Sequence, residues 1–115
     1  MAVRMDKPWR PLDTGAVAGL PGQLGVYQIA DGAGEIRYIG FAGGRSLFGL
    51  RGELEAELAA RDPEGRGGFQ FRVEVNMAYL TRYRELLMAY RADHGDLPAD
   101  NRESPPPGLG RMSPA

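Results

Sequence analysis

The chain contains no cysteine and no long apolar run. Without cysteine, disulfide bonds and Cys-ligated zinc sites are excluded. No stretch approaches the roughly 20 apolar residues that a membrane-spanning helix needs. Residues 1–9 also lack the apolar run of a signal peptide. We therefore expect a cytoplasmic protein with no membrane partner.

The chain also lacks a surplus of basic residues. Its 14 Lys and Arg face 15 Asp and Glu, which gives a formal net charge of -1. Nucleic-acid-binding domains often carry a basic surplus, because phosphate contacts release counterions. The overall charge gives no support to nucleic-acid binding, although the arginines can still gather on one face. With 115 residues and 43% hydrophobic content, we expect one domain with one core.

Hydrophobic periodicity and turn residues predict the order of the secondary structure. The Asp-Gly pair at residues 31–32 favours a tight turn between two strands. Ser46 is expected to cap a helix whose buried face includes Leu47, Leu50, Leu54 and Leu58. The predicted elements are an irregular segment over residues 1–12, a helical turn over 16–20, strands over 25–30 and 35–41, a helix to about residue 61, a strand over 69–75 and a helix over 77–94.

This order predicts an α+β fold in which a small three-stranded sheet, mixed or antiparallel, is flanked by helices. The main elements follow the order strand, strand, helix, strand, helix. We expect the folded domain to cover residues 13–101. Residues 102–115 include Pro105, Pro106 and Pro107 and are expected to form a disordered tail.

The second long helix carries a carboxylate at an ambiguous position. One broad stripe of this helix is apolar and aromatic, and Glu85 lies within a second stripe of small and adaptable residues. A carboxylate among such neighbours is costly to bury unless a metal ion or an arginine pairs with it. The alternative is that Glu85 is a solvated surface glutamate on a helix with one core face.

The hairpin contains two tripeptides with a defined spacing. Gly25-Val26-Tyr27 is followed, after ten residues, by Tyr38-Ile39-Gly40. This pattern resembles the GIY-YIG nuclease family, and is closest to the incision subunit of bacterial nucleotide excision repair. Matching residues around the tripeptides are Leu20, Pro21, Asp31 and Gly34.

Later elements of that family also have counterparts in order. The family's helix arginine is matched by Arg51, its helix glutamate by Glu85, and its Pro-x-x-Asn ending by residues 98–101. Two departures stand out. The family's arginine usually follows the second glycine by about eight residues, where this chain has Phe48. The neutral residues 41–44 also remove positive charge that the family often has there.

The resemblance implies a metal-dependent endonuclease that hydrolyses phosphodiester bonds of DNA, or of RNA. Glu85 would hold a single Mg²⁺ or Mn²⁺ ion, and Arg51 would clamp the scissile phosphate. Tyr27 or Tyr38 would orient the attacking water, and Asn101 would fix the site or the segment that closes it. Gly25 and Gly40 belong to the motif by resemblance, with close backbone packing as the physical reason. A lone domain of this kind would have weak sequence preference, take its specificity from a partner protein, or recognise its substrate by shape. The oligomeric state stays open.

Each of these residues also has a simpler reading. Tyr27 and Tyr38 lie on adjacent strands and can form a cross-strand aromatic pair. Arg51 and Glu55 are four residues apart and can form an ion pair on the helix surface. Arg45, near a helix start, can bind phosphate together with free backbone N–H groups, or can be solvated. The alternative function is a non-catalytic, GIY-YIG-like module that binds nucleic acid or protein.

Overall fold

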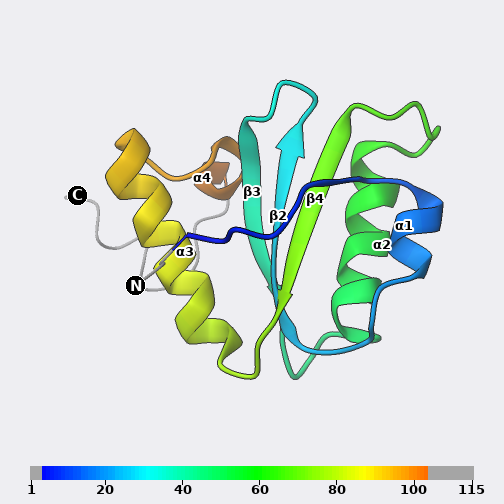
Figure 1. Cartoon of the computed structure of the whole chain (residues 1–115), viewed down its shortest axis with the longest axis horizontal. Helices are drawn as coiled ribbons and strands as arrows, with labels where there is room; N and C mark the ends of the chain where they lie inside the picture. The colour runs from blue at the N-terminus through cyan, green and yellow to red at the C-terminus, as the bar shows by residue number, and fades with distance from the viewer. Residues whose placement is uncertain (1–3, 104–115) are drawn as a thin grey trace.

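The computed structural model describes residues 4–103 of the chain. Its centre is one antiparallel sheet whose strands lie in the order β1-β4-β2-β3. Helices cover both faces of this sheet (Figure 1). The strands are β1 (Arg10–Pro11), β2 (Gly25–Asp31), β3 (Ile36–Ala42) and β4 (Phe69–Val75), and the helices are α1 (Thr14–Ala18), α2 (Gly49–Arg61), α3 (Tyr79–His94) and α4 (Ala99–Glu103).

The hairpin of β2 and β3 is the framework of the molecule. Both side-chain and backbone bonds define its turn: Asp31 Oδ1 accepts from the amides of Ala33 and Glu35, and the Asp31 carbonyl accepts from the Gly34 amide. Tyr27 lies opposite Gly40, and Ile29 lies opposite Tyr38. An irregularity follows Ile29, so that the register shifts by one residue near the turn. The predicted antiparallel hairpin is therefore present, with each strand ending one residue later than expected.

Alternation along the strands divides the interior into two cores. On one face, Tyr27 and Ile29 pack with Leu50 and Leu54 of α2. On the other face, Val26 joins a cluster that comprises Met5, Ile39, Tyr83, Leu86, Leu87 and Leu97. Successive strand residues point to opposite faces, so the sheet separates the α2 side from the α3 side. In Figure 1 these two helices stand on either side of the sheet.

The predicted α+β class is confirmed, but the predicted sheet is wrong in strand number. A fourth strand, β1, pairs with β4 at Arg10–Phe71 and Pro11–Gln70. It lies within residues 1–12, which were expected to be irregular. Two residues that include a proline give no periodic signal, which explains why the sequence pattern missed this strand. At the other end, Arg102 and Glu103 belong to α4, and residues 104–115 lie outside the described residues.

The start of α2 also differs from the prediction. Ser46 does not cap the helix; its hydroxyl donates to Glu53 and accepts from the Gly43 amide. The helix begins at Gly49, after Phe48 in a left-handed conformation with φ 63°. Leu47 therefore precedes the helix and is 78% exposed instead of buried. Among the described residues, no helix has both the length and the apolar character to span a membrane.

Candidate functional site

Tyr27 and Tyr38 lie together on the α2 face of the sheet. Their ring centroids are 6.0 Å apart and the rings are tilted by 46°. The Tyr27 ring extends across Gly40, where an added Cβ would come within 2.4 Å of Tyr27 Cζ. The hairpin register thus brings the two phenols together, and the glycine opposite Tyr27 leaves room for its ring.

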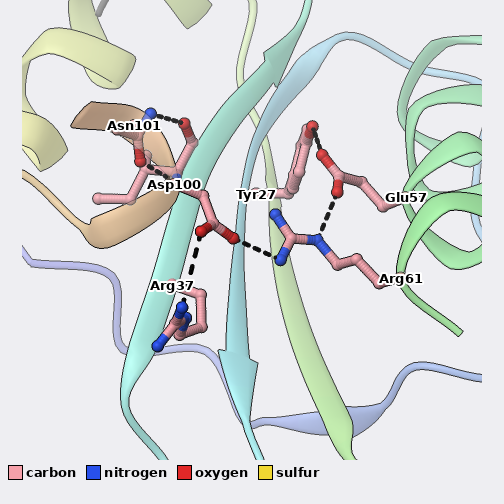
Figure 2. Close-up of polar contacts among 7 residues, drawn as sticks. Tyr27, Arg37, Glu57, Arg61, Asp100 and Asn101 are labelled. Atoms are coloured by element: carbon pink, nitrogen blue, oxygen red, sulfur yellow. Dashed lines mark hydrogen bonds and ion pairs between the residues drawn. The ribbon is translucent and has the colours of Figure 1, made fainter. Parts of the chain in front are cut away.

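A chain of polar contacts runs from the Tyr27 hydroxyl to the far side of β3 (Figure 2). The hydroxyl donates to Glu57 Oε2 over 2.7 Å. Glu57 Oε1 accepts from Arg61 Nε at 2.7 Å, and Arg61 Nη1 donates to Asp100 Oδ2 at 2.7 Å. Asp100 Oδ1 lies 3.7 Å from Arg37 Nη2. This Tyr27–Glu57–Arg61–Asp100 network links β2, α2 and α4.

The network is largely shielded from water. The Arg61 and Glu57 side chains are only 15% and 16% exposed, and Asp100 is 26% exposed. The Arg61 guanidinium also lies 5.7 Å from the centroid of the Tyr38 ring. Burial lowers the pKa of Arg61, but hydrogen bonds to Glu57 and Asp100 outweigh that effect and raise the pKa above its usual value. The guanidinium is therefore fixed as a cation between two carboxylates.

The surroundings of the two phenols favour their protonated forms. Burial, followed by the charge of Glu57, raises the pKa of Tyr27 well above its usual value. Burial and the charges of Glu57 and Glu53 likewise raise the pKa of Tyr38, and Arg61 offsets only part of this. A general base needs a pKa close to the working pH. Neither phenol meets that condition, so both stay protonated at neutral pH, and the Tyr27 hydroxyl donates to Glu57.

Asn101, on α4, lies beside the edge of β3 that faces away from β2, and it closes this free edge. Its Oδ1 accepts from the Ile39 amide at 2.8 Å, and its Nδ2 donates to the Ile39 carbonyl at 3.0 Å. Since β3 is the edge strand, these backbone groups have no strand partner on that side. The carboxamide, which is 1% exposed, takes the place of a neighbouring strand. Figure 2 shows both bonds.

Gly25 is required by the close approach of two backbones. An added Cβ at this position would lie 2.2 Å from the Glu74 carbonyl oxygen of β4. A side chain would force β2 and β4 apart. A side chain is therefore excluded at the two motif glycines for different reasons. At Gly25 it would meet the backbone of β4, and at Gly40 it would meet the Tyr27 ring.

Arg51 and Arg45 lie apart from the network. Arg51 precedes Glu57 by six residues, which places it about 120° away around the helix at about 100° per residue. Within the described part of the chain, neither arginine forms an ion pair. The alternative pair between Arg51 and Glu55 is therefore absent from the structure. Arg45 is exposed, four residues before α2 begins.

Three backbone amides in the first turn of α2 are already bonded within the protein. The amides of Leu50, Arg51 and Gly52 donate to the carbonyls of Gln23, Pro21 and Phe48. An anion site at a helix start depends on N–H groups that remain free. These three amides are therefore not available to bind a phosphate together with Arg45.

Glu85 lies on α3, across the sheet from both tyrosines. Its side chain is 45% exposed, and Oε1 is 3.0 Å from Arg82 Nη1. Arg82 in turn bonds both carboxylate oxygens of Glu74 on β4. Glu85 is thus a partly exposed glutamate on the helix surface, and it is paired with an arginine instead of being solvated alone. The structure brings Tyr27 and Tyr38 together but does not bring Glu85 or Arg51 to them.

The residues do not fit the expected magnesium or manganese ion. Mg²⁺ is usually held by one or two carboxylates together with substrate phosphates and water. Glu85 is engaged with Arg82, and Glu57 is engaged with Tyr27 and Arg61. Across residues 4–103, no group of three or more His, Cys, Asp or Glu side chains is arranged to hold a metal. No chemical step through a metal ion follows from this donor set.

Sequence reasoning missed Glu57, Arg61 and Asp100. The first two carried a usable signal, because they follow Leu54 by three and seven residues and so lie on the helix face toward the sheet. Charged residues on a core-facing stripe, four apart and of opposite sign, indicate a shielded ion pair. Asp100 carried no local signal, since its position depends on where α4 docks against β3.

Large apolar side chains are exposed at the end of the sheet where β3 leads into α2 and β4 leads into α3 (Figure 1). Leu47 and Met77 are each 78% exposed, and Phe48 is 65% exposed. The two connections adjoin the same segment, because the Asn76 amide donates to Leu24 and the Leu50 amide donates to Gln23. Exposed groups of this kind often mark interaction surfaces.

Comparison with known proteins overturns the resemblance to the GIY-YIG nucleases. Residues 3–93 match the family model described as "Domain of unknown function (DUF7508)", which is not a GIY-YIG nuclease family. No curated protein and no solved structure matches the chain. The motif residues have structural uses that explain their presence without catalysis: Gly40 accommodates a ring, and Asn101 closes a strand edge. The chain therefore belongs to the family described as "Domain of unknown function (DUF7508)".

Proposed function

We propose that this domain is a non-catalytic module that binds another protein. The observation that carries the proposal is the closed Tyr27–Glu57–Arg61–Asp100 network. The groups that would perform chemistry are bonded to one another instead of facing a substrate. Such a network is suited to fixing the relative positions of β2, α2 and α4, which keeps a binding surface in one shape.

The charge around the tyrosines opposes the binding of a phosphate. Glu53, Glu57 and Asp100 all raise the pKa of Tyr38 through their negative charge. A phosphate that reached Arg61 would have to displace a carboxylate from a guanidinium already bonded to Glu57 and Asp100. Removing one partner from a shielded ion pair is costly. These features support a structural role for Arg61 over a phosphate clamp.

A protein partner fits the surface better than a nucleic acid. The chain has a net charge of -1, so it lacks the overall basic surplus that often drives nucleic-acid binding. The exposed side chains of Leu47, Phe48 and Met77 instead supply apolar area of the kind that protein interfaces bury. Phosphodiester cleavage of DNA stays a prediction, and it is the function against which the proposal is tested.

The first arm of the test measures cleavage and nucleic-acid binding. The purified chain is incubated with duplex, branched and single-stranded DNA, and with RNA, in the presence of Mg²⁺ or Mn²⁺. We expect no nicking above the level of the Tyr27→Phe variant, and no binding that weakens with added salt. Metal-dependent nicking by the parent chain that is lost in Glu85→Gln would overturn the proposal.

The second arm looks for binding to protein segments. A random peptide library is selected on the folded domain and, as a control, on the domain unfolded in urea. We expect a consensus that is enriched only on the folded domain. Absence of any folded-state consensus, together with nucleic-acid cleavage, would establish the opposite function.

A further inference from the structure

We propose that the groove between α1, α2 and the loop of residues 62–68 binds an extended segment of a partner protein that carries a basic side chain beside apolar ones. The inference rests on the proposed protein-binding function and names the chemistry of the partner. The groove has a volume of about 880 Å³. That size lies within the range typical of sites that hold a small ligand or a short peptide.

The floor of the groove is apolar and continuous with the core. Leu12 and Val17 are each 1% exposed, and both belong to the core on the α2 side of the sheet. Leu58 and Phe69 pack against that core and also line the groove. An apolar side chain laid on this floor would gain burial without any rearrangement of the domain.

The loop that forms one wall is held in shape by Asp62. Its two carboxylate oxygens accept from the amides of Arg66 and Gly67, each at 2.8 Å. Gly65 and Gly67 adopt positive φ values of 68° and 81°, which the loop needs in order to turn back on Asp62. The wall is therefore preorganised, which limits the entropy lost when a ligand binds.

The rim of the groove is acidic. Three exposed carboxylates line it, against one guanidinium; the carboxylates are those of Asp13, Glu55 and Glu64, while that of Asp62 is buried in the loop. The guanidinium, that of Arg66, is already paired with Glu64 at 2.9 Å. Glu55 is exposed and forms no ion pair within the described part of the chain. A cationic side chain is the complement of this rim, and Glu55 is its nearest free partner.

Charge complementarity also favours a basic and apolar protein segment over a nucleic acid or a purely apolar segment. A nucleic acid would place phosphates against the carboxylates and would be repelled. A purely apolar segment would use the floor but leave the acidic rim without a partner. An extended segment with alternating basic and apolar residues satisfies both, because neighbouring side chains on an extended chain point in opposite directions.

The test uses a defined probe. A fluorescein-labelled peptide of sequence Ala-Leu-Arg-Val-Lys-Ala is titrated with the full chain and followed by anisotropy. A matched peptide has glutamine in place of the arginine and lysine. We expect the basic peptide to bind at least about tenfold more tightly than the glutamine peptide, with an affinity that falls as salt is added.

Two pairs of variants locate the site. Glu55→Lys reverses charge at the groove, and Glu103→Lys makes the same change at an exposed position on α4. Ala59→Trp fills the groove from an exposed position on α2, and Ala60→Trp adds the same bulk outside the lining. We expect Glu55→Lys and Ala59→Trp each to weaken binding by about tenfold or more, and the two controls to leave it within about twofold.

Equal affinity for the two peptides, no binding at millimolar concentration, or equal effects of groove and control variants would each overturn the assignment of the groove. Such a result leaves the proposed function standing if the peptide library still yields a folded-state consensus, since that consensus would then bind elsewhere. Circular dichroism of each variant confirms that the fold is retained, because all four substitutions lie at exposed positions.

Discussion

The ring of Tyr27 lies across the backbone of Gly40, its neighbour on the adjacent strand. An added Cβ on Gly40 would come within 2.4 Å of Tyr27 Cζ and 2.5 Å of its hydroxyl oxygen. The ring cannot retreat easily, because it is 2% exposed and its hydroxyl is bonded to Glu57. The phenol and the glycine are therefore a matched pair, and the conformation of each depends on the other.

Gly40→Ala should destabilise the domain by about 1–3 kcal/mol, as overpacking of a filled core does. Urea unfolding measures the loss. Gly32→Ala serves as the control, because the nearest atom to its added Cβ is 3.6 Å away and its effect should be small. The cost of Gly40→Ala should shrink when Tyr27 is also replaced by leucine. A cost that is unchanged in the Tyr27→Leu background would show that the ring is not the cause.

Asn101→Ala should cost about 2–4 kcal/mol of stability, because it removes two hydrogen bonds and leaves the backbone groups of Ile39 without partners. Asn101→Asp should also destabilise, since a carboxylate keeps the acceptor but loses the donor. Hydrogen exchange gives a second readout: the Ile39 amide should lose protection in Asn101→Ala. Retained protection of that amide would mean that another group closes the β3 edge.

Arg61→Met should destabilise by about 2 kcal/mol, because Glu57 would be left as a shielded carboxylate without a cation, and Asp100 would keep only the longer contact to Arg37. The matched control is Arg66→Met. Arg66 and Glu64 are 79% and 66% exposed, and pairs of that kind contribute little. Urea unfolding of the two variants compares the sites. Equal costs would show that shielding of the Tyr27–Glu57–Arg61–Asp100 network has no energetic effect.

The domain should lose stability above about pH 10, the usual pKa of tyrosine in an unfolded chain. Burial raises the pKa of Tyr27 and Tyr38 in the folded chain, and raises that of Tyr83 to about 12. A raised folded-state pKa contributes stability that is present below the unfolded pKa and is lost as the pH rises. The tyrosinate absorbance of these three buried or half-buried side chains should therefore appear together with unfolding. In Tyr27→Phe the alkaline slope should be shallower by about 1.4 kcal/mol per pH unit.

Local patterns predicted three of the four strands and the phenol pair, because these depend on residue alternation and on one hairpin register. The register that pairs Tyr27 with Gly40 follows from the turn at Asp31. The location of Glu85 relative to the two tyrosines could not be predicted from the sequence. Periodicity shows which helix face is apolar but not which side of the sheet the helix covers. The place of Asp100 likewise depends on tertiary docking of α4 against β3.

The predicted start of α2 was wrong for a different reason. Ser46 is a favourable cap residue by type, yet the chain continues for two residues and enters the helix through Phe48 at φ 63°. Gly49, at φ 57°, packs against the backbone of Gly22, where an added Cβ would lie 2.4 Å from its carbonyl carbon. Contact between two distant backbone segments thus decides where the helix begins, and no local propensity reports it.

Phe48 itself offers a test of stored strain. A non-glycine residue in the left-handed region costs about 1–2 kcal/mol, and the Phe48 side chain is 65% exposed, so it recovers little by packing. Glycine adopts this conformation freely but raises the entropy of the unfolded chain by about 0.5–1 kcal/mol. Phe48→Gly should therefore leave stability unchanged or raise it by up to about 1 kcal/mol.

Leu47→Gly is the control, because Leu47 is also exposed but does not have a positive φ. It should lose about 0.5–1 kcal/mol, the entropic cost alone. Urea unfolding of the two variants measures the difference. A Phe48→Gly variant that loses more stability than Leu47→Gly would mean that the exposed aromatic ring stabilises the domain through contacts, and that the left-handed conformation is not the dominant effect.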